Sequence, residues 1–473
     1  MREEWIVDEK QIYGWIEQVF GWGVRRPGYP ADRRAEQFSA ERFRELGLDD
    51  VRLEPVPLPY WEPRSWSLHV SAGGEDFELD CFPLPHSAPC EELELELAEL
   101  DPSGMRGETS GASAVTGKAA LFDVPMIRLP PAAPVGGGSL IAELQGQVEI
   151  GINPGGRIID PRGSFEGSEQ VLPFGAQIQS VMEPSIEAGA AAFLGTLSGY
   201  PGDGFEYYVP YDGVERAIPG VWLRGSDGAR LRDLLTRGPV RVRLRVDSLR
   251  ETVTCHNVVG ELPGADDDRV VIGSHHDGPW SSAVEDASGM SLVFAQAAYW
   301  AKLPRAERPH RMLFLLNAGH MVGGAGVHRF IADHAAELSS IVLELHLEHA
   351  ANQVVLRDGE LVATGEPEPR WFFTSRIPRL ENAVADALER EGVDRSLILR
   401  PDAFGPQPTT DGGPFHLAGV PLVNYLTAPF YLFDRIDTLD KIHRPSLVAV
   451  TRAAIRMLES TAGVSAKEMR GSS

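Results

Sequence analysis

The sequence has 473 residues, 43% of them hydrophobic and 24% charged, which is ordinary for a globular protein and long enough for two or three domains. The formal net charge of −24 argues against nucleic acid or an anionic membrane surface as a partner. Three cysteines are too few for a disulfide framework, and no apolar run approaches the length of a membrane span. Because the N-terminus lacks a basic start followed by an apolar run, we expect no signal peptide and a cytoplasmic protein.

The first half of the chain is predicted to form two helices and then many strands. Residues 8–21 and 30–47 have helical spacing around the turn-rich GWGVRRPGYP, and VRLEPVPL then alternates as a strand. Strand-like segments such as KAALFDVP, AAFLGTL and VRVRLRV follow, separated by loops such as PPAAPVGGGS. Two short helices are expected among them, at residues 183–190 and 227–237. This texture predicts a β-rich domain of residues 63–252 inserted into a domain of residues 1–62 and 253–473.

The second half of the chain alternates strands with helices. The expected strands are residues 270–274, 311–317, 341–348, 396–400 and 420–426. The expected helices are residues 288–302, 323–335, 379–391 and 445–459. Such alternation predicts an α/β fold with a mostly parallel sheet covered by helices on both faces.

One stretch, RVVIGSHHDGPWSSAVEDASG, carries the strongest chemical signal. A buried strand delivers His275, His276 and Asp277 to a loop, and Glu285 and Asp286 follow just before an apolar helix. Ligands bind at the carboxyl ends of strands in an α/β sheet, so a His-x-Asp there, followed by carboxylates, predicts a metal site. The alternative is one packed and one solvated histidine.

The order of several segments resembles zinc metallopeptidase family twenty-eight, which includes bacterial aminopeptidases and glutamate carboxypeptidase. GVRRPGYPADRRAEQFSAERFRELGL resembles the opening helix pair of that family, and EAGAAAFLGTLSGYPG resembles its protease-associated insert. GSHHDG, VEDASG, LELHLEHA and GVPLVNY follow the family's order and spacing. The resemblance implies a mixed, mostly parallel sheet flanked by helices, the phosphorylase/hydrolase-like zinc-peptidase fold, with an inserted β-rich protease-associated domain.

The family binds two zinc ions, and the resemblance places one set of ligands on donors in this sequence. His275 falls at the first ligand and Asp277 at the carboxylate that orients it. Glu285 falls at the bridging carboxylate, and Glu348 falls at a carboxylate on a later strand. The resemblance therefore implies that this metal site is kept.

The ligand positions of the other zinc are occupied by Met321 and Phe433, neither of which binds a hard metal ion. The resemblance therefore implies that the second zinc site is lost. A slip of one residue in this mapping would move two of the retained ligands, to Asp286 and His349.

His320 occupies the family's general-base position. A histidine with an ordinary pKa of about 6.5 can accept a proton, or it can bind metal with His275, Glu285 and Glu348. Such nitrogen and oxygen ligation suits zinc, which the resemblance favours, and also iron or manganese. The alternative is a polar residue left in a decayed site.

Further polar and aromatic residues are expected around a substrate. The period of two along a strand places His346 on the same face as Glu344 and Glu348, with His349 on the other face unless the strand has ended. Asp411 matches a family acid near the substrate. The predicted pocket residues are His276, His346, Asp411, Tyr425 and Phe433.

These inferences predict a mononuclear metal-dependent hydrolase acting on an amide, N-acyl or amino-substituted small molecule or a short peptide-like substrate. General aminopeptidase activity is not expected, because loss of the second ion removes the usual anchor for a free α-amine. Two alternatives stay open. One is a non-hydrolytic metal enzyme, such as a lyase, a cyclase or an iron-dependent enzyme, and the other is a metal-free pseudopeptidase acting as a binding protein. The sequence also leaves a homo-oligomer open.

Overall fold

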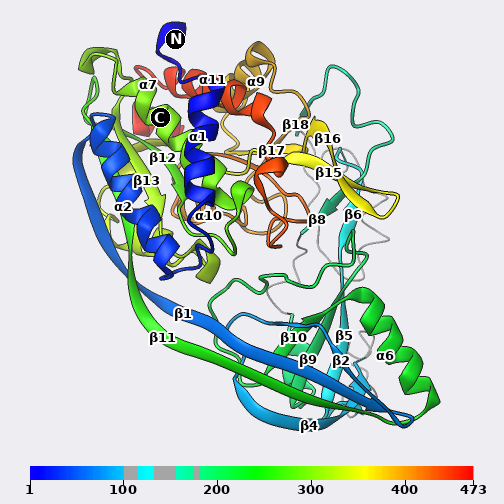
Figure 1. The fold of residues 1–473 in the computed structure, drawn as a ribbon. Helices are drawn as coiled ribbons and strands as arrows, with labels where there is room; N and C mark the ends of the chain where they lie inside the picture. The colour runs from blue at the N-terminus through cyan, green and yellow to red at the C-terminus, as the bar shows by residue number, and fades with distance from the viewer. Residues whose placement is uncertain (101–113, 133–155, 174–180, 472–473) are drawn as a thin grey trace.

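A long two-stranded ribbon connects an α/β lobe to a β-rich lobe in the computed structural model, which describes residues 1–100, 114–132, 156–173 and 181–471. Strands β1 (Asp49–Ala72) and β11 (Val240–Leu262) pair antiparallel along almost their whole length and run side by side from one lobe to the other (Figure 1). The sequence predicted several shorter strands here. The predicted domain boundaries, at residues 62–63 and 252–253, fall inside these two strands and stay a prediction.

The sheet of the α/β lobe is mixed and mostly parallel, as predicted. Its parallel core consists, in spatial order, of β13 (Arg311–Asn317), β12 (Arg269–His275), β14 (Ile341–Leu347) and β19 (Leu422–Thr427). Strand β11 is antiparallel to β13 at one side. At the other side β17 (Arg370–Thr374) is antiparallel to β19 and parallel to β18 (Ser396–Leu399). The sequence did not predict β17, because a short apolar run such as RWFFT has no period that identifies it.

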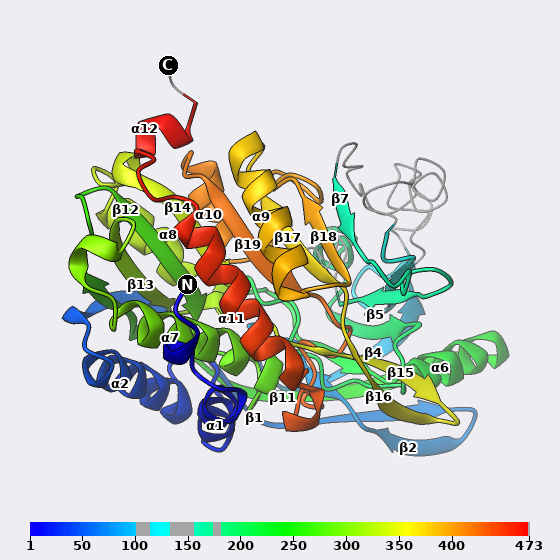
Figure 2. The ribbon, with the colours of Figure 1, turned by 90° about the horizontal axis from the view of Figure 1, so that it is seen from above.

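Helices cover both faces of this sheet. They are α1 (Glu9–Phe20), α2 (Pro30–Glu45), α7 (Gly289–Trp300), α8 (Ala325–Asp333), α9 (Pro378–Glu391), α10 (Gly412–Leu417), α11 (Arg444–Glu459) and α12 (Ala466–Met469). Figure 2 shows α7, α9 and α11 together over one face. Val270 and Ile272 of β12 pack in the core with α7, whereas Val271 between them packs with α8 and α10, so these three central residues are apolar because both faces of the sheet are buried. Among the described residues, no helix combines the length and the apolarity needed to cross a bilayer.

The β-rich lobe consists mainly of β2 (Glu75–Leu79), β3 (Phe82–Pro83), β4 (Cys90–Glu99), β5 (Ala119–Pro125), β9 (Ala192–Ser198), β10 (Gly220–Leu223), α5 (Glu183–Glu187) and α6 (Gly225–Arg237). The segment between β5 and α5 also reaches the α/β lobe, where β7 (Arg157–Ile159) pairs with β18 and the two-stranded sheet of β6 (Ile127–Leu129) and β8 (Gln170–Leu172) packs against β17 and β18. A separate hairpin, β15 (Asn352–Arg357) and β16 (Glu360–Pro367), follows β14 in the chain. The predicted loop PPAAPVGGGS lies largely outside the described residues, and the assignment of this region as a protease-associated domain stays a prediction.

Aromatic packing seats the N-terminal helices on the α/β lobe. The ring of Phe294 in α7 meets Trp15 of α1 and Phe38 and Phe43 of α2 edge to face, with centroids 5.7–5.8 Å apart. This cluster fixes the turn between α1 and α2, which carries Arg25 toward the centre of the lobe.

Candidate metal centre

Three neighbouring parallel strands end at one edge of the sheet and deliver polar side chains there. His275 is the last residue of β12, His320 follows β13 in a short turn, and Glu348 and His349 follow β14. Because carboxyl ends of parallel strands meet at one edge, residues far apart in the sequence come together. All four side chains are almost fully buried.

Glu285 reaches the same place from the loop between β12 and α7, and main-chain contacts hold that loop. The amide groups of Val284 and Glu285 each donate to the carboxylate of Asp437 at 2.9 Å. The guanidinium group of buried Arg25 donates to several main-chain carbonyls along the loop. These carbonyls belong to His276, Ser281, Ser282 and Glu285. The position of the Glu285 carboxylate is therefore fixed from both sides of its own backbone.

The three histidines of the centre all use the same ring nitrogen to bind the protein. Nδ1 of His275 donates to the main-chain carbonyl of Asp277 (3.1 Å), Nδ1 of His320 to a carboxylate oxygen of Asp411 (2.9 Å), and Nδ1 of His349 to the main-chain carbonyl of Thr427 (2.7 Å). An imidazole whose Nδ1 carries the proton presents Nε2 as its lone-pair donor. Such a partner on the second nitrogen is typical of histidines that bind a metal ion.

The three Nε2 atoms converge on one carboxylate. Those of His275 and His320 lie 3.4 and 3.8 Å from Oε1 of Glu285, and that of His349 is in close contact with Oε2 of the same group. The rings of His275 and His320 are stacked nearly parallel, with centroids 4.0 Å apart. The structure thus places three imidazole nitrogens and a carboxylate around one point.

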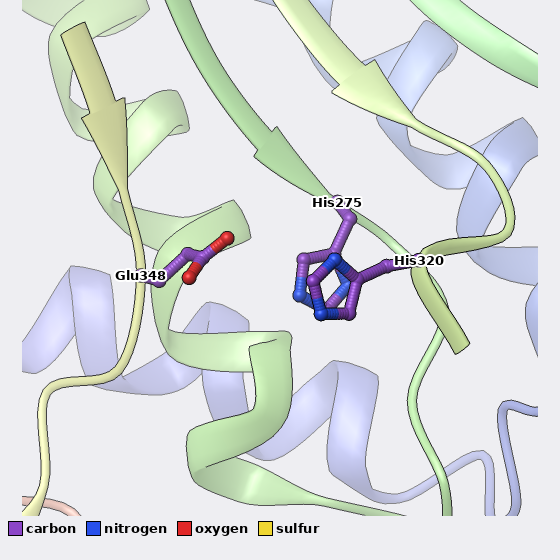
Figure 3. Close-up of side chains that lie close together, drawn as sticks. All are labelled: His275, His320 and Glu348. Carbon is purple, nitrogen blue, oxygen red and sulfur yellow. The ribbon is translucent and has the colours of Figure 1, made fainter. Parts of the chain in front are cut away.

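Glu348 completes the cluster from the opposite side. Figure 3 shows its side chain directed toward His275 and His320. Potential ligand atoms of these three residues lie within 4.8 Å of one another, and the same is true of His275, Glu285 and His349. The two sets share His275, with His320 and Glu348 in one set and Glu285 and His349 in the other.

The donor atoms fit a metal ion by two tests. First, Nε2 of His275, Nε2 of His349 and both carboxylate oxygens of Glu285 are buried and contact one another, but none of them makes a well-formed hydrogen bond among the described residues. Buried polar atoms left without partners are costly unless a ligand satisfies them. Second, burial alone would lower the pKa of His320, but Asp411, Glu285 and Glu348 outweigh it and raise that pKa to about 10. These carboxylates favour a cation at the centre, which is a proton on the imidazole until a metal ion displaces it.

Aromatic rings occupy the side of the centre where the second zinc ligands were mapped. The ring of Phe433 stacks on that of Tyr211 (4.8 Å between centroids), and Tyr211 stacks on His320 (5.7 Å). Met321, which follows His320 in the chain, is fully buried. The two mapped positions thus hold a thioether and a phenyl ring in place of a carboxylate and an imidazole.

Two predicted carboxylate roles change. The carboxylate of Asp277 accepts hydrogen bonds from the amides of His320 (3.1 Å) and Met321 (2.8 Å), and only its main-chain oxygen orients His275. The alternative ligand Asp286 is turned into the protein, where it accepts from the amide of Gly289 (2.8 Å) and from the hydroxyl of Ser274. The loop therefore presents Glu285, and not Asp286, to the centre.

Three residues predicted for the substrate pocket lie elsewhere. His276 turns away, with Nδ1 bonded to Asp32 (2.8 Å) and Nε2 to the carbonyl of His256 (3.0 Å). The hydroxyl of Tyr425 donates to the main chain of His349. His346 is buried behind Glu348. All three are unavailable to a substrate for the same reason, because their polar groups already bind the main chain or another side chain.

The other two pocket predictions contact the centre indirectly. Asp411 orients His320 through Nδ1, and Phe433 reaches that histidine only through Tyr211.

The sequence did not point to Tyr211 as a residue of the centre, although the aromatic run YYVPY marks its segment. The sequence offered His349 as a ligand only if the mapping to the family is shifted by one residue. Strand β14 ends at Leu347, and a left-handed backbone at His349 (φ 52°) turns its ring to the centre.

Peptidases are among the known proteins that this chain resembles. The sequence model described as Peptidase family M28 matches residues 257–458. This part of the chain belongs to peptidase family M28. A probable leucine aminopeptidase 2 from Aspergillus oryzae is 28% identical over 228 residues, which are 46% of this chain and 43% of that protein. The alignment thus spans less than half of the length of this relative.

Solved structures show the same fold over nearly the whole chain. A peptidase M28 precursor from Shewanella amazonensis superimposes with a TM-score of 0.70 at 19% identity, covering 96% of this chain and 94% of the other. BSAP, a zinc aminopeptidase from Bacillus subtilis, superimposes with a TM-score of 0.63 at 17% identity, covering 94% of each chain. The M28 domain and the β-rich lobe are therefore arranged as in known peptidase structures.

The contacts of Arg25 generate a prediction about the Glu285 loop. Replacement by lysine keeps the charge but removes the fork of donors that reaches several carbonyls at once. We expect Arg25→Lys to lower both the melting temperature and the affinity for a divalent metal ion, the affinity by about tenfold as for other groups that orient ligands. Calorimetry and chelator competition measure the two quantities.

The matched control is Arg33→Lys. Arg33 also donates to main-chain carbonyls, those of Gly28 and Thr254, but it lies on α2 away from the loop. Equal metal affinity in the parent and in Arg25→Lys would contradict the proposed role of Arg25.

Proposed function

We propose that the M28 domain binds one divalent metal ion and hydrolyses an amide bond in a small-molecule or short peptide-like substrate. The observation that carries the proposal is the convergence of three imidazole Nε2 atoms on the Glu285 carboxylate, in a buried cluster with unsatisfied donor atoms. Membership of peptidase family M28 supports hydrolysis.

The ion would be held by the three histidines and Glu285, with Glu348 as a further carboxylate ligand. A bound divalent ion polarises a carbonyl group and lowers the pKa of water toward neutrality. Zinc is favoured by the family, and the donor set also suits iron or manganese. His320, predicted from the sequence as acid–base group or ligand, is a ligand in this proposal, because Asp411 holds its Nδ1 proton. The carboxylate oxygens of Glu285 and Glu348 that do not bind the ion would accept the proton of that water.

The aromatic side of the centre supports a substrate without a free α-amine. Met321 and Phe433 stand at two ligand positions of the second zinc, so the charged amine of an aminopeptidase substrate would meet apolar groups there. An N-acyl, amide or amino-substituted compound with an apolar part avoids this desolvation cost.

Metal content tests the proposal most simply. Elemental analysis of protein purified without added metal or nickel affinity resin should give about one equivalent of a transition metal. His275→Ala and His349→Ala should retain little metal, because each removes an imidazole ligand. His310→Gln, which replaces a buried histidine bonded to Asp266 and to the carbonyl of Thr461, should retain it. Two equivalents would contradict a single centre, and none would favour the metal-free binding protein.

Substrate class is tested with chromogenic anilides in pairs that differ only at the amine. We expect an N-acetylated aminoacyl anilide to be cleaved at least tenfold more efficiently, in kcat/KM, than the same compound with a free amine. The expected ratio corresponds to about 1.4 kcal/mol of transition-state stabilisation. Faster cleavage of the free amine would contradict the proposed preference, and turnover of neither compound by metal-loaded protein would favour a non-hydrolytic enzyme.

A further inference from the structure

A chain of three ionisable side chains runs along β14 and ends at the candidate metal centre. Glu344 and His346 lie on the strand, Glu348 follows its last residue, and all three are almost fully buried. Nδ1 of His346 lies 2.9 Å from Oε1 of Glu344, and its Nε2 lies 2.9 Å from Oε1 of Glu348. The imidazole therefore links the two carboxylates.

His346 differs in this respect from the histidines of the centre. Each of those binds the main chain or Asp411 through Nδ1 and directs Nε2 toward the Glu285 carboxylate, whereas both nitrogens of His346 bind the carboxylates of Glu344 and Glu348. It has no nitrogen left for a metal ion. Its contact with the centre runs through Glu348, whose other oxygen lies 3.9 Å from Nε2 of His349.

The neighbouring strand makes room for this chain. Gly273 of β12 pairs with His346 across the sheet, and a Cβ atom at position 273 would lie only 2.9 Å from both Oε1 of Glu344 and Nδ1 of His346. That distance is shorter than real Cβ contacts, so glycine is needed there for the three side chains to adopt this arrangement.

Burial of three ionisable groups costs free energy of folding, so their presence along β14 needs an explanation. A purely structural pair would have both carboxylates satisfied, but Oε2 of Glu344 has no hydrogen-bond partner among the residues that the structure describes. An apolar strand would fill the same space without the cost of desolvating charge. The chain is therefore better explained by its effect on Glu348.

We propose that Glu344 and His346 are positioning residues that hold the Glu348 carboxylate toward the metal centre. The inference rests on the proposed function, because it presumes an ion at the centre. Partners that orient a ligand typically change metal affinity by about 10- to 100-fold when they are removed. Glu344 acts one step further back, since it sets the orientation of the His346 ring.

Cobalt binding to the full chain tests this proposal. Co²⁺ affinity is measured by competition with a chelator, and the visible absorption of the bound Co²⁺ reports its ligand geometry. We expect His346→Gln to bind Co²⁺ about 10- to 100-fold more weakly and with an altered spectrum. His310→Gln, the buried-histidine control, should match the parent in both.

Two substitutions at Glu344 separate hydrogen bonding from simple loss of packing. Glu344→Gln keeps an acceptor for Nδ1 of His346 and should retain an affinity within about threefold of the parent. Glu344→Ala removes the acceptor and should lose at least tenfold, the lower bound for such partners. If His346→Gln does not fold, this pair decides the question. Equal Co²⁺ affinity and spectra for Glu344→Gln and Glu344→Ala would overturn the proposal.

The result also separates this inference from the proposed function. A parent protein that binds no Co²⁺ would contradict the metal centre itself. A parent that binds Co²⁺ with the same affinity and spectrum as His346→Gln would overturn only the role of Glu344 and His346.

Discussion

Hydrogen bonds donated by Nδ1 of three histidines orient the rings at the candidate metal centre. Two main-chain carbonyls and the carboxylate of Asp411 accept these bonds, so each ring directs its Nε2 atom inward. Carboxylate oxygens that face one point repel each other unless a cation lies between them, and that cation is a protonated imidazole or a metal ion. The same contacts that orient the rings therefore also favour metal binding.

The fold supplies this arrangement from elements that are far apart in the chain. Parallel strands bring His275, His320 and His349 to one edge of the sheet, and the contacts of Arg25 and Asp437 fix the loop that carries Glu285. Residue Tyr211, from the segment between β9 and β10, stacks on His320. The centre is thus assembled by both lobes, which is consistent with its almost complete burial.

Periodicity and the family resemblance predicted much of this. Helical and strand periods located the parallel strands and the longer helices of the α/β lobe, and the resemblance pointed to His275 and Glu285 as ligands, which stays a prediction. The failures lie where a backbone turn decides where a side chain points. His349 follows the end of β14 and adopts a left-handed conformation, which reverses the face expected from a period of two. His276 is adjacent to a ligand, yet its partner Asp32 lies on α2, a contact that local sequence cannot show.

The family resemblance maps two ligands of the second zinc to Met321 and Phe433, and the ring of Phe433 stacks on Tyr211, which stacks on His320. Loss of those ligands, together with a gain of imidazoles around Glu285, is the central claim. X-ray absorption fine structure of the zinc-loaded protein tests it most directly. The account predicts scattering from about three imidazole rings and no neighbouring metal at the roughly 3.5–4 Å typical of two-metal sites. A metal–metal distance in that range, or a single imidazole per ion, would contradict it.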